Sequence, residues 1–250
     1  TSSLNTSLER LSSGLRINRA ADDAAGLAIA EGFNSVVRGS QVAQRNAQDG
    51  VSLVQTAEGS LSETTSILQR IRELAVQSAN GTQSTENRAA LNAEVNQLLQ
   101  QIDDIAFDTE FNGLRVLSAS QTITLQTGSR GGQTLEIATA GANTRDLRIS
   151  TVTVSSMASA VNAISTIDSA IQAVNTMRST FGAFQNRLDF TINTLAIQEE
   201  NSAASESAIR DADIARETIA FTRNQILVSA GTSVLAQANL VPQTALTLLG

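Results

Sequence analysis

Apolar residues recur every three or four positions through most of this 250-residue chain, which is the spacing of one face of an α-helix. The longest such pattern runs over 155–205 and predicts one long helix. Its average step of about 3.5 residues is the period of a left-handed coiled-coil seam. The seam positions are Met157, Val161, Ile164, Ile167, Ile171, Val174, Met177, Phe181, Phe184, Leu188, Ile192 and Leu195. We therefore expect this helix to pack along its length against other long helices.

Two further segments supply those neighbours. Residues 33–79 carry two apolar lines, so this helix is expected to contact more than one partner, and Asn80-Gly81 is a typical helix stop. The first line is Val51, Val54, Ala57, Leu61, Leu68, Ile71 and Ala75, and the second is Leu53, Ile67 and Leu74. Residues 84–107 have heptad spacing, with Ser84 or Asn87 as the helix cap. Its seam is Leu91, Val95, Leu98, Ile102 and Ile105.

Both ends of the chain are also predicted to be helical. Residues 1–31 are interrupted at Ser12-Ser13-Gly14, and Asp22 or Asp23 is the expected cap where the helix restarts. The pattern fits either a kinked helix or a structured connector. Residues 206–250 form the last helix, and 224–250 contain no charged side chain. One stripe of that tail is Ile226, Ala230, Val234, Ala238 and Val241, widened by Leu227 and Leu235. An apolar face of this length predicts an interaction surface.

Between residues 114 and 154 apolar residues recur at every second position instead, which is the spacing of β-strands. Alternating apolar pairs predict three or four short strands, with a hairpin loop at 128–132 and a turn at Phe111-Asn112-Gly113. The pairs are Ile123/Leu125, Leu135/Ile137, Leu147/Ile149 and Val152/Val154. So small a β region has to pack on the helices. The predicted fold class is therefore mainly α: a long antiparallel helical bundle or coiled coil with a small β-hairpin region.

Composition narrows the function. All 17 basic residues are Arg, and the chain contains no His and no Cys, so a Ser-His or Cys-His nucleophile, an ordinary zinc site, a Schiff base and a Walker-type loop are excluded. We expect no enzyme and no cofactor. The net charge of −7 argues against a nucleic-acid partner, and no apolar run is long enough to span a membrane.

The remaining charged groups carry weak signals. Neighbouring carboxylates such as Asp22 and Asp23 point in different directions on a helix and do not form a shared acid–base site. The acidic residues between Asp103 and Glu110 lack the spacing of an EF-hand, so no metal site is expected. Ion pairing within the helix explains the charged group Arg70, Arg72 and Glu73. The alternative is that this group forms a protein-binding patch.

Several motifs of this chain resemble those of bacterial flagellin, and the resemblance covers nearly the whole sequence. They are Leu11–Asn18 (LSSGLRIN), Asp22–Gly26 (DDAAG), Gln69–Gln77 (QRIRELAVQ), Phe111–Gly113 with Val116–Leu117, Gln225–Leu227, Ala230–Asn239 (AGTSVLAQAN), Val241–Gln243 and Leu248–Leu249. The resemblance implies a structural subunit that polymerises into the flagellar filament and supports motility. It implies a D0-like layer of 1–32 with 206–250, and a D1-like helical rod of 33–205 that includes the β region 114–154.

The same resemblance implies which residues and partners matter. The expected subunit-assembly residues are Leu8, Leu11, Leu15, Ile226, Leu227, Val234, Leu235 and Val241. Expected partners are other flagellin subunits, the hook–filament junction and cap proteins, the flagellar export chaperone and the flagellin-sensing Toll-like receptor. Export by the flagellar type III pathway to an extracellular filament is implied as well.

Three departures from the family pattern qualify these expectations. The sequence begins inside the amino-terminal segment, after the part that carries the export signal. The region between Leu117 and Val154 holds only a short β segment, which suggests a minimal flagellin without outer domains. The candidate receptor contacts are Arg70, Leu74 and Gln101, and Gln101 stands where the family has Glu. The rival functions are a flagellin-like cell-surface protein that binds a glycan or host receptor, and a soluble helical export or chaperone protein.

Overall fold

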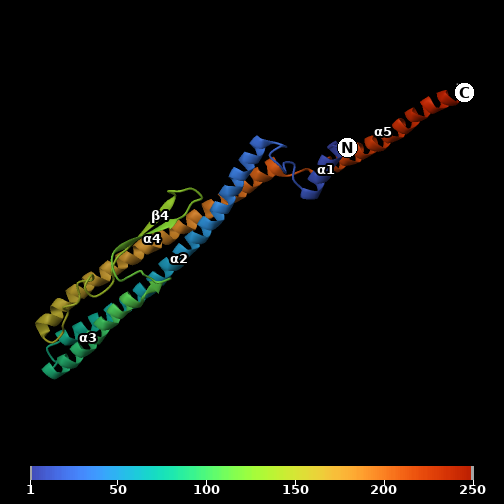
Figure 1. Cartoon of the computed structure of the whole chain (residues 1–250). Helices are drawn as coiled ribbons and strands as arrows, with labels where there is room; N and C mark the ends of the chain where they lie inside the picture. Colours follow the sequence, from blue (N-terminus) through green and yellow to red (C-terminus); the bar gives the residue numbers. More distant parts are fainter. Residues whose placement is uncertain (1, 249–250) are drawn as a thin grey trace. The chain divides into compact units, whose positions relative to one another are not determined.

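The computed structural model describes residues 2–248, with side chains described for residues 2–238, and it is mainly helical (Figure 1). The helices are α1 (Ser2–Ser13), α2 (Ala24–Ala79), α3 (Thr85–Asp108), α4 (Met157–Arg210) and α5 (Ile214–Leu248). The strands are β1 (Glu110–Phe111), β2 (Leu114–Arg115), β3 (Gln121–Gln126) and β4 (Thr134–Thr139). The predicted fold class of long helices with a small β region is confirmed.

The chain forms two compact units, and the division falls inside α2 and α4. The central unit is Gly39–Ile197, and the terminal unit contains the residues up to Arg38 and from Gln198 onward. The assignment of 1–32 with 206–250, and of 33–205, to two layers of a filament stays a prediction.

The core of the central unit lies where α2, α3 and α4 meet beneath the β3–β4 hairpin. The first predicted line of α2 is buried throughout, and Leu53 and Leu74 of the second line are buried as well. Val95, Ile102 and Ala106 bring α3 into the same cluster, and Phe181 and Leu188 do so for α4. Arg70 pairs with Glu94 of α3 and Arg72 with Asp168 of α4, so α2 contacts more than one neighbour, as predicted.

The start of α4 departs from the predicted seam. Met157 and Val161 are exposed, and the buried positions of the first turns are Ala160 and Ala163. Small side chains let the helix approach its neighbours closely there, so the seam of large residues begins at Ile164 and Ile167.

Two of the four predicted strand pairs form a hairpin. In the antiparallel β3–β4 pair Ile123 lies opposite Ile137 and Leu125 opposite Leu135. Leu135 and Ile137 face the core. The turn between β1 and β2 is Asn112-Gly113, and both residues have positive φ, 52° and 77°.

The other two predicted pairs are not strands. Leu147, Ile149, Val152 and Val154 are buried, but their segment is a series of turns. Its amides bond locally, from Ile149 N to Thr144 O and from Val152 N to Ile149 O. Every second residue is therefore buried in parts of this segment although it pairs with no neighbouring strand.

A structured connector separates α1 from α2 in the terminal unit. Gly14 ends α1 with φ of 72°, and Leu15 then forms an antiparallel bridge with Asp211. Asp23 caps α2 because its Oδ1 accepts from Gly26 N at 2.9 Å. The predicted cap at Asp22 or Asp23 is therefore confirmed for Asp23. The predicted boundaries before residues 33 and 206 were wrong, because α2 continues without a break from Ala24 to Ala79, and α4 continues to Arg210 before α5 begins at Ile214.

Candidate functional site

Helix α5 is the element that the sequence singles out, and α1 packs against it in the terminal unit. Leu4 and Leu11 of α1 are half-buried, and Ser7 between them is buried. A side chain as small as Ser7 allows the two helices to approach closely. Arg10 Nη1 and Glu217 Oε2 form an ion pair at 3.9 Å beside this contact.

The contact with α1 covers only part of α5. Five large apolar side chains of α5 remain between 59% and 69% exposed: Ile219, Ile226, Leu227, Val234 and Leu235. The apolar residues of α5 are spread around the helix rather than gathered on one face. Apolar side chains on several sides of one helix favour contact with more than one neighbour. We call these five residues the exposed α5 surface.

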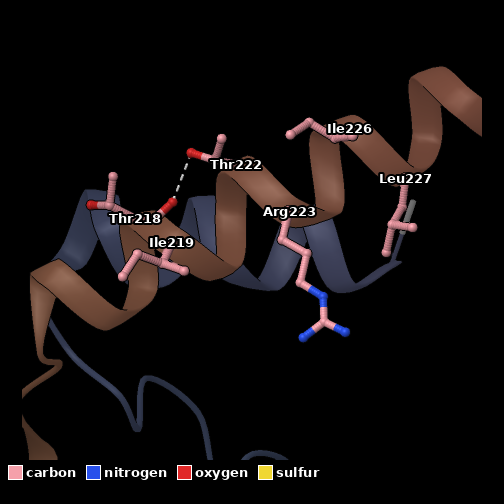
Figure 2. A pocket seen from close by; sticks show the side chains of 6 residues that line it. All are labelled: Thr218, Ile219, Thr222, Arg223, Ile226 and Leu227. Atoms are coloured by element: carbon pink, nitrogen blue, oxygen red, sulfur yellow. Dashed lines mark hydrogen bonds between the residues drawn. The ribbon is translucent and has the colours of Figure 1, made fainter.

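A shallow hollow of about 440 Å³ lies on this surface. Figure 2 shows Thr218, Thr222 and Ile226 on one side of the helix, with Ile219, Arg223 and Leu227 on another. The Thr222 hydroxyl donates to Thr218 O at 2.9 Å, so it presents its methyl group to the hollow. Among the described residues Arg223 has no ion pair and is the last charged side chain of the helix. The hollow suits an apolar partner better than a polar ligand.

The predicted assembly residues fall into three groups. Ile226, Leu227, Val234 and Leu235 are exposed on α5, and Leu8 is exposed on α1. Leu11 and Leu15 are half-buried. The side chain of Val241 lies outside the described residues. The structure thus brings the two helices together but leaves most of the predicted side chains without a partner inside the described part of the chain.

The predicted receptor contacts lie in different environments. Arg70 on α2 is exposed, and its guanidinium contacts Glu94 Oε1 of α3 at 2.8 Å and Glu73 Oε2 at 3.1 Å. The hydrogen bond to Glu94, and then that to Glu73, raises the pKa of Arg70 above its ordinary value. Gln101 is exposed on α3, whereas Leu74 is only 1% exposed and belongs to the core.

Of the acidic residues between 103 and 110, Asp103 has a clear role in the fold. Asp103 accepts from Thr144 N at 2.8 Å and from the Thr144 hydroxyl at 2.9 Å, which holds the loop after β4 on α3. Within the part of the chain that the structure describes, no three Asp or Glu side chains are grouped closely enough to hold a metal ion. The same residues contain no helix that is both long and apolar enough to cross a membrane.

Two of the exposed large apolar residues that sequence reasoning missed are the most exposed of all in the described part of the chain. Ile219 lies in the charged half of the last helix, and Phe190 lies on α4 outside the predicted seam. The signal was a large apolar residue out of register with the buried line of its own helix, because such a residue has to point away from the core.

Comparison with known proteins adds the family context. Residues 1–122 match the family model of the bacterial flagellin N-terminal helical region, and residues 164–249 match that of the C-terminal helical region. A flagellin of Halalkalibacterium halodurans is 47% identical over 97% of this chain and 90% of its own length. The flagellar filament 31.3 kDa core protein of Treponema maltophilum is 45% identical over 97% of this chain and 91% of its own length.

Solved structures agree with this context. The crystal structure of Bacillus cereus flagellin matches with a TM-score of 0.53 at 35% identity, covering 60% of this chain and 88% of that one. A putative flagellar hook-associated protein from Vibrio parahaemolyticus has a TM-score of 0.64 at 13% identity over 76% of this chain and 100% of its own, a likeness of fold alone.

Proposed function

The chain belongs to the bacterial flagellin family, and from this membership we propose how it acts as a structural subunit of the flagellar filament. The exposed α5 surface is the site through which copies of the chain assemble. Together with α1 it forms the inner layer of the filament, and the central unit forms the layer around it. Motility follows from polymerisation, and the chain acts without catalysis.

One observation carries this proposal: apolar residues occur on all sides of α5, and the five large side chains of the exposed α5 surface are each at least 59% exposed. Burying each such side chain contributes roughly 1.5–3 kcal/mol, so contact with other copies is strongly favoured. A contact between different surfaces that repeats without closing produces an open helical filament. Relatives named as flagellar filament core proteins are consistent with that outcome.

Removal of residues 224–250 tests the proposal. The shortened chain should no longer elongate filament seeds in negative-stain electron microscopy, while circular dichroism should retain the helical signal of the central unit. Normal elongation by the shortened chain would contradict the proposal. Loss of the whole helical signal would show that the central unit depends on the tail.

A matched pair of variants locates the surface more finely. Ile226→Ser with Leu227→Ser removes two exposed apolar side chains, and Gln225→Ser with Ser229→Ala alters two exposed polar positions of the same helix. The first pair should raise the critical concentration for assembly about a hundredfold or more, since it removes about 3 kcal/mol or more of burial. The second pair should leave it unchanged.

The same surface accounts for the other proposed partners. Before assembly the exposed α5 surface needs a cover, which we assign to the flagellar export chaperone. The hook–filament junction and cap proteins meet it at the ends of the filament. Co-purification of a chaperone with the full chain, and its loss with the Ile226/Leu227 variant, tests the first assignment. Secretion that stops in a strain lacking the flagellar type III apparatus tests the export route to the extracellular filament.

Recognition by the flagellin-sensing Toll-like receptor is the remaining proposal. It is supported by the exposure of Arg70 and Gln101 on neighbouring helices, whereas the predicted contact Leu74 is buried and is not part of the proposed surface. A receptor-reporter assay comparing the chain with its Gln101→Glu variant measures the effect of the altered position. Stronger activation by the variant is expected. Equal strong activation by both proteins would show that Gln101 does not weaken receptor recognition.

A further inference from the structure

Phe190 is the most exposed large apolar side chain among the described residues, at 73%. It lies on the part of α4 that belongs to the central unit, whereas the exposed α5 surface belongs to the terminal unit. The residues one turn away on the same face of α4, Arg187 and Thr194, are polar and exposed, so no other apolar side chain adjoins the ring along this face. A single aromatic side chain in such a place has the form of an anchor for a pocket on a partner.

The same unit also carries an unfilled apolar pocket. A hollow of about 440 Å³ lies between the end of β4 and α4. Its lining includes Ala138, Ala173, Thr176, Met177, Thr180 and Phe181. We call it the β4–α4 pocket. Its volume falls within the range of about 300–1,000 Å³ that is usual for small-ligand pockets, so it can accept an aromatic ring.

The hydroxyl groups of the α4 side of this pocket are already satisfied. The Thr176 hydroxyl donates to Gln172 O at 2.9 Å, and the Thr180 hydroxyl donates to Thr176 O at 3.0 Å. Both threonines therefore present methyl groups to the pocket. Met177 adds a flexible thioether, which makes favourable contacts with aromatic rings. An apolar guest would enter without leaving an unpaired hydroxyl behind.

Phe190 cannot fill the pocket of its own chain. It lies fourteen positions beyond Thr176 on the same helix, which corresponds to a rise of about 21 Å. The ring and the pocket are thus two different, mutually suited surfaces of one unit. Such a pair generates a head-to-tail contact that repeats without closing.

We propose that Phe190 of one copy inserts into the β4–α4 pocket of the next copy in the filament. This inference rests on the proposed assembly function and adds a second contact, made by the central units, to the contact made by α5. The partner is a second copy of this chain because the family forms homopolymers and because both halves of the contact occur on the same unit.

Cysteine pairing tests the contact directly, because the natural chain contains no Cys. The variant Phe190→Cys with Thr176→Cys is assembled on seeds and treated with a mild thiol oxidant. A disulfide within one chain is ruled out, since the Cα atoms must lie within about 7 Å. A ladder of covalent multimers on a non-reducing gel is expected.

The matched control is Phe190→Cys with Asn175→Cys. Asn175 is exposed and adjacent to Thr176, but it points about 100° away around the helix. It should give no ladder. Filaments without a ladder in the first variant, or with equal ladders in both, would overturn the inference while leaving assembly through α5 intact. Failure of the unaltered chain to form filaments would overturn both proposals.

A second measurement avoids cysteine. Phe190→Ser should raise the critical concentration for assembly roughly tenfold or more, because it removes a large apolar contact. Phe190→Leu should restore much of the loss, and the folded monomer should be unchanged by circular dichroism because the residue is exposed. An unchanged critical concentration for Phe190→Ser would contradict the inference.

Discussion

Arg88 is a buried guanidinium whose hydrogen-bond partners are all backbone carbonyls. It donates to Ser78 O at the end of α2, to Asn80 O at 3.0 Å and to Gln83 O at 3.4 Å. The last carbonyls of a helix have no partner within the helix. Arg88 therefore caps α2 from the first turn of α3 and fixes the reversal between the two helices.

Replacing Arg88 by Met should cost about 1–3 kcal/mol of unfolding free energy, because buried carbonyls lose their donor. Urea unfolding followed by circular dichroism measures the loss. Arg72→Met is the control, since Arg72 makes an exposed ion pair with Asp168 at 2.6 Å, and exposed pairs contribute little. Equal losses for both variants would refute the capping role.

Asp22 supplies a pH-dependent prediction at the same scale. Its carboxylate accepts from Arg19 N at 2.9 Å and Asn18 N at 3.1 Å, and these hydrogen bonds, Arg19 first, lower the pKa of Asp22. A lowered pKa means that the stabilisation is complete above the ordinary value of about 3.9 and is lost as the pH falls through the lowered pKa. NMR titration should place Asp22 below its value in the urea-unfolded chain. Equal values in both states would contradict this.

At the scale of elements, α2 and the hairpin approach each other at Gly50. A Cβ at this position would clash with Leu125 Cδ1 of β3. Gly59 lies further along the same helix, and a Cβ there would meet no atom within 4 Å. Alanine at Gly59 therefore tests helix propensity alone, and alanine at Gly50 tests helix propensity together with packing against the hairpin.

Gly50→Ala should destabilise the central unit by about 1–3 kcal/mol, because overpacking displaces the hairpin. Gly59→Ala should instead stabilise it by roughly 0.5–1 kcal/mol, because glycine is a poor helix former. Thermal unfolding of the two variants beside the unaltered chain gives both signs. Stabilisation by both would mean that the hairpin moves freely on α2.

Element by element, local patterns predicted the helices better than the β region. The first apolar line of α2 and the stop at Asn80-Gly81 correspond to the structure because a helix buries the face that its own period defines. On α3 Val95 and Ile102 are buried as predicted. The other buried apolar positions of α3 are Leu99 and Ala106, and Ile105 lies outside the core. The segment from Leu147 to Val154 failed because turns reproduced a period of two. The connector from Gly14 to Asp23 was only partly predicted, since its partners lie far along the sequence.

At the candidate site, too, local patterns predicted single helices better than contacts between distant segments. The uncharged tail predicted an apolar surface on α5, and exposed side chains such as Ile226 and Leu235 lie there. The apolar pattern placed Leu74 on a line that packs against a neighbour, and its burial agrees with that pattern rather than with the receptor contact that the resemblance implied. The β4–α4 pocket was not foreseen, since two distant segments form it.

At the scale of the whole molecule, the two units differ in how much apolar surface they bury. The large core cluster lies entirely within the central unit, between Ala47 and Leu188. The terminal unit buries few large side chains, and α5 is mostly exposed. Local stability follows buried apolar contact.

Hydrogen exchange of the unassembled chain should therefore show two levels of protection. Amides of α2, α3 and α4 in the central unit are expected to exchange slowly, at the rate set by global unfolding. Amides of α1 and α5 should exchange roughly tenfold faster or more and become protected on assembly. Uniform protection across both units of the monomer would contradict this expectation.

The bridge between Leu15 and Asp211 also determines when the terminal unit can fold during synthesis. Arg16 and Ile209, which meet beside this bridge, are 193 positions apart. At a synthesis rate of about 5–20 residues per second, the first residues wait roughly 10–40 s for these partners. A chain released early would lack α5 and the second half of the connector. The terminal unit can therefore close only after α5 has been synthesised, so a nascent chain becomes able to assemble long after α1 has left the ribosome.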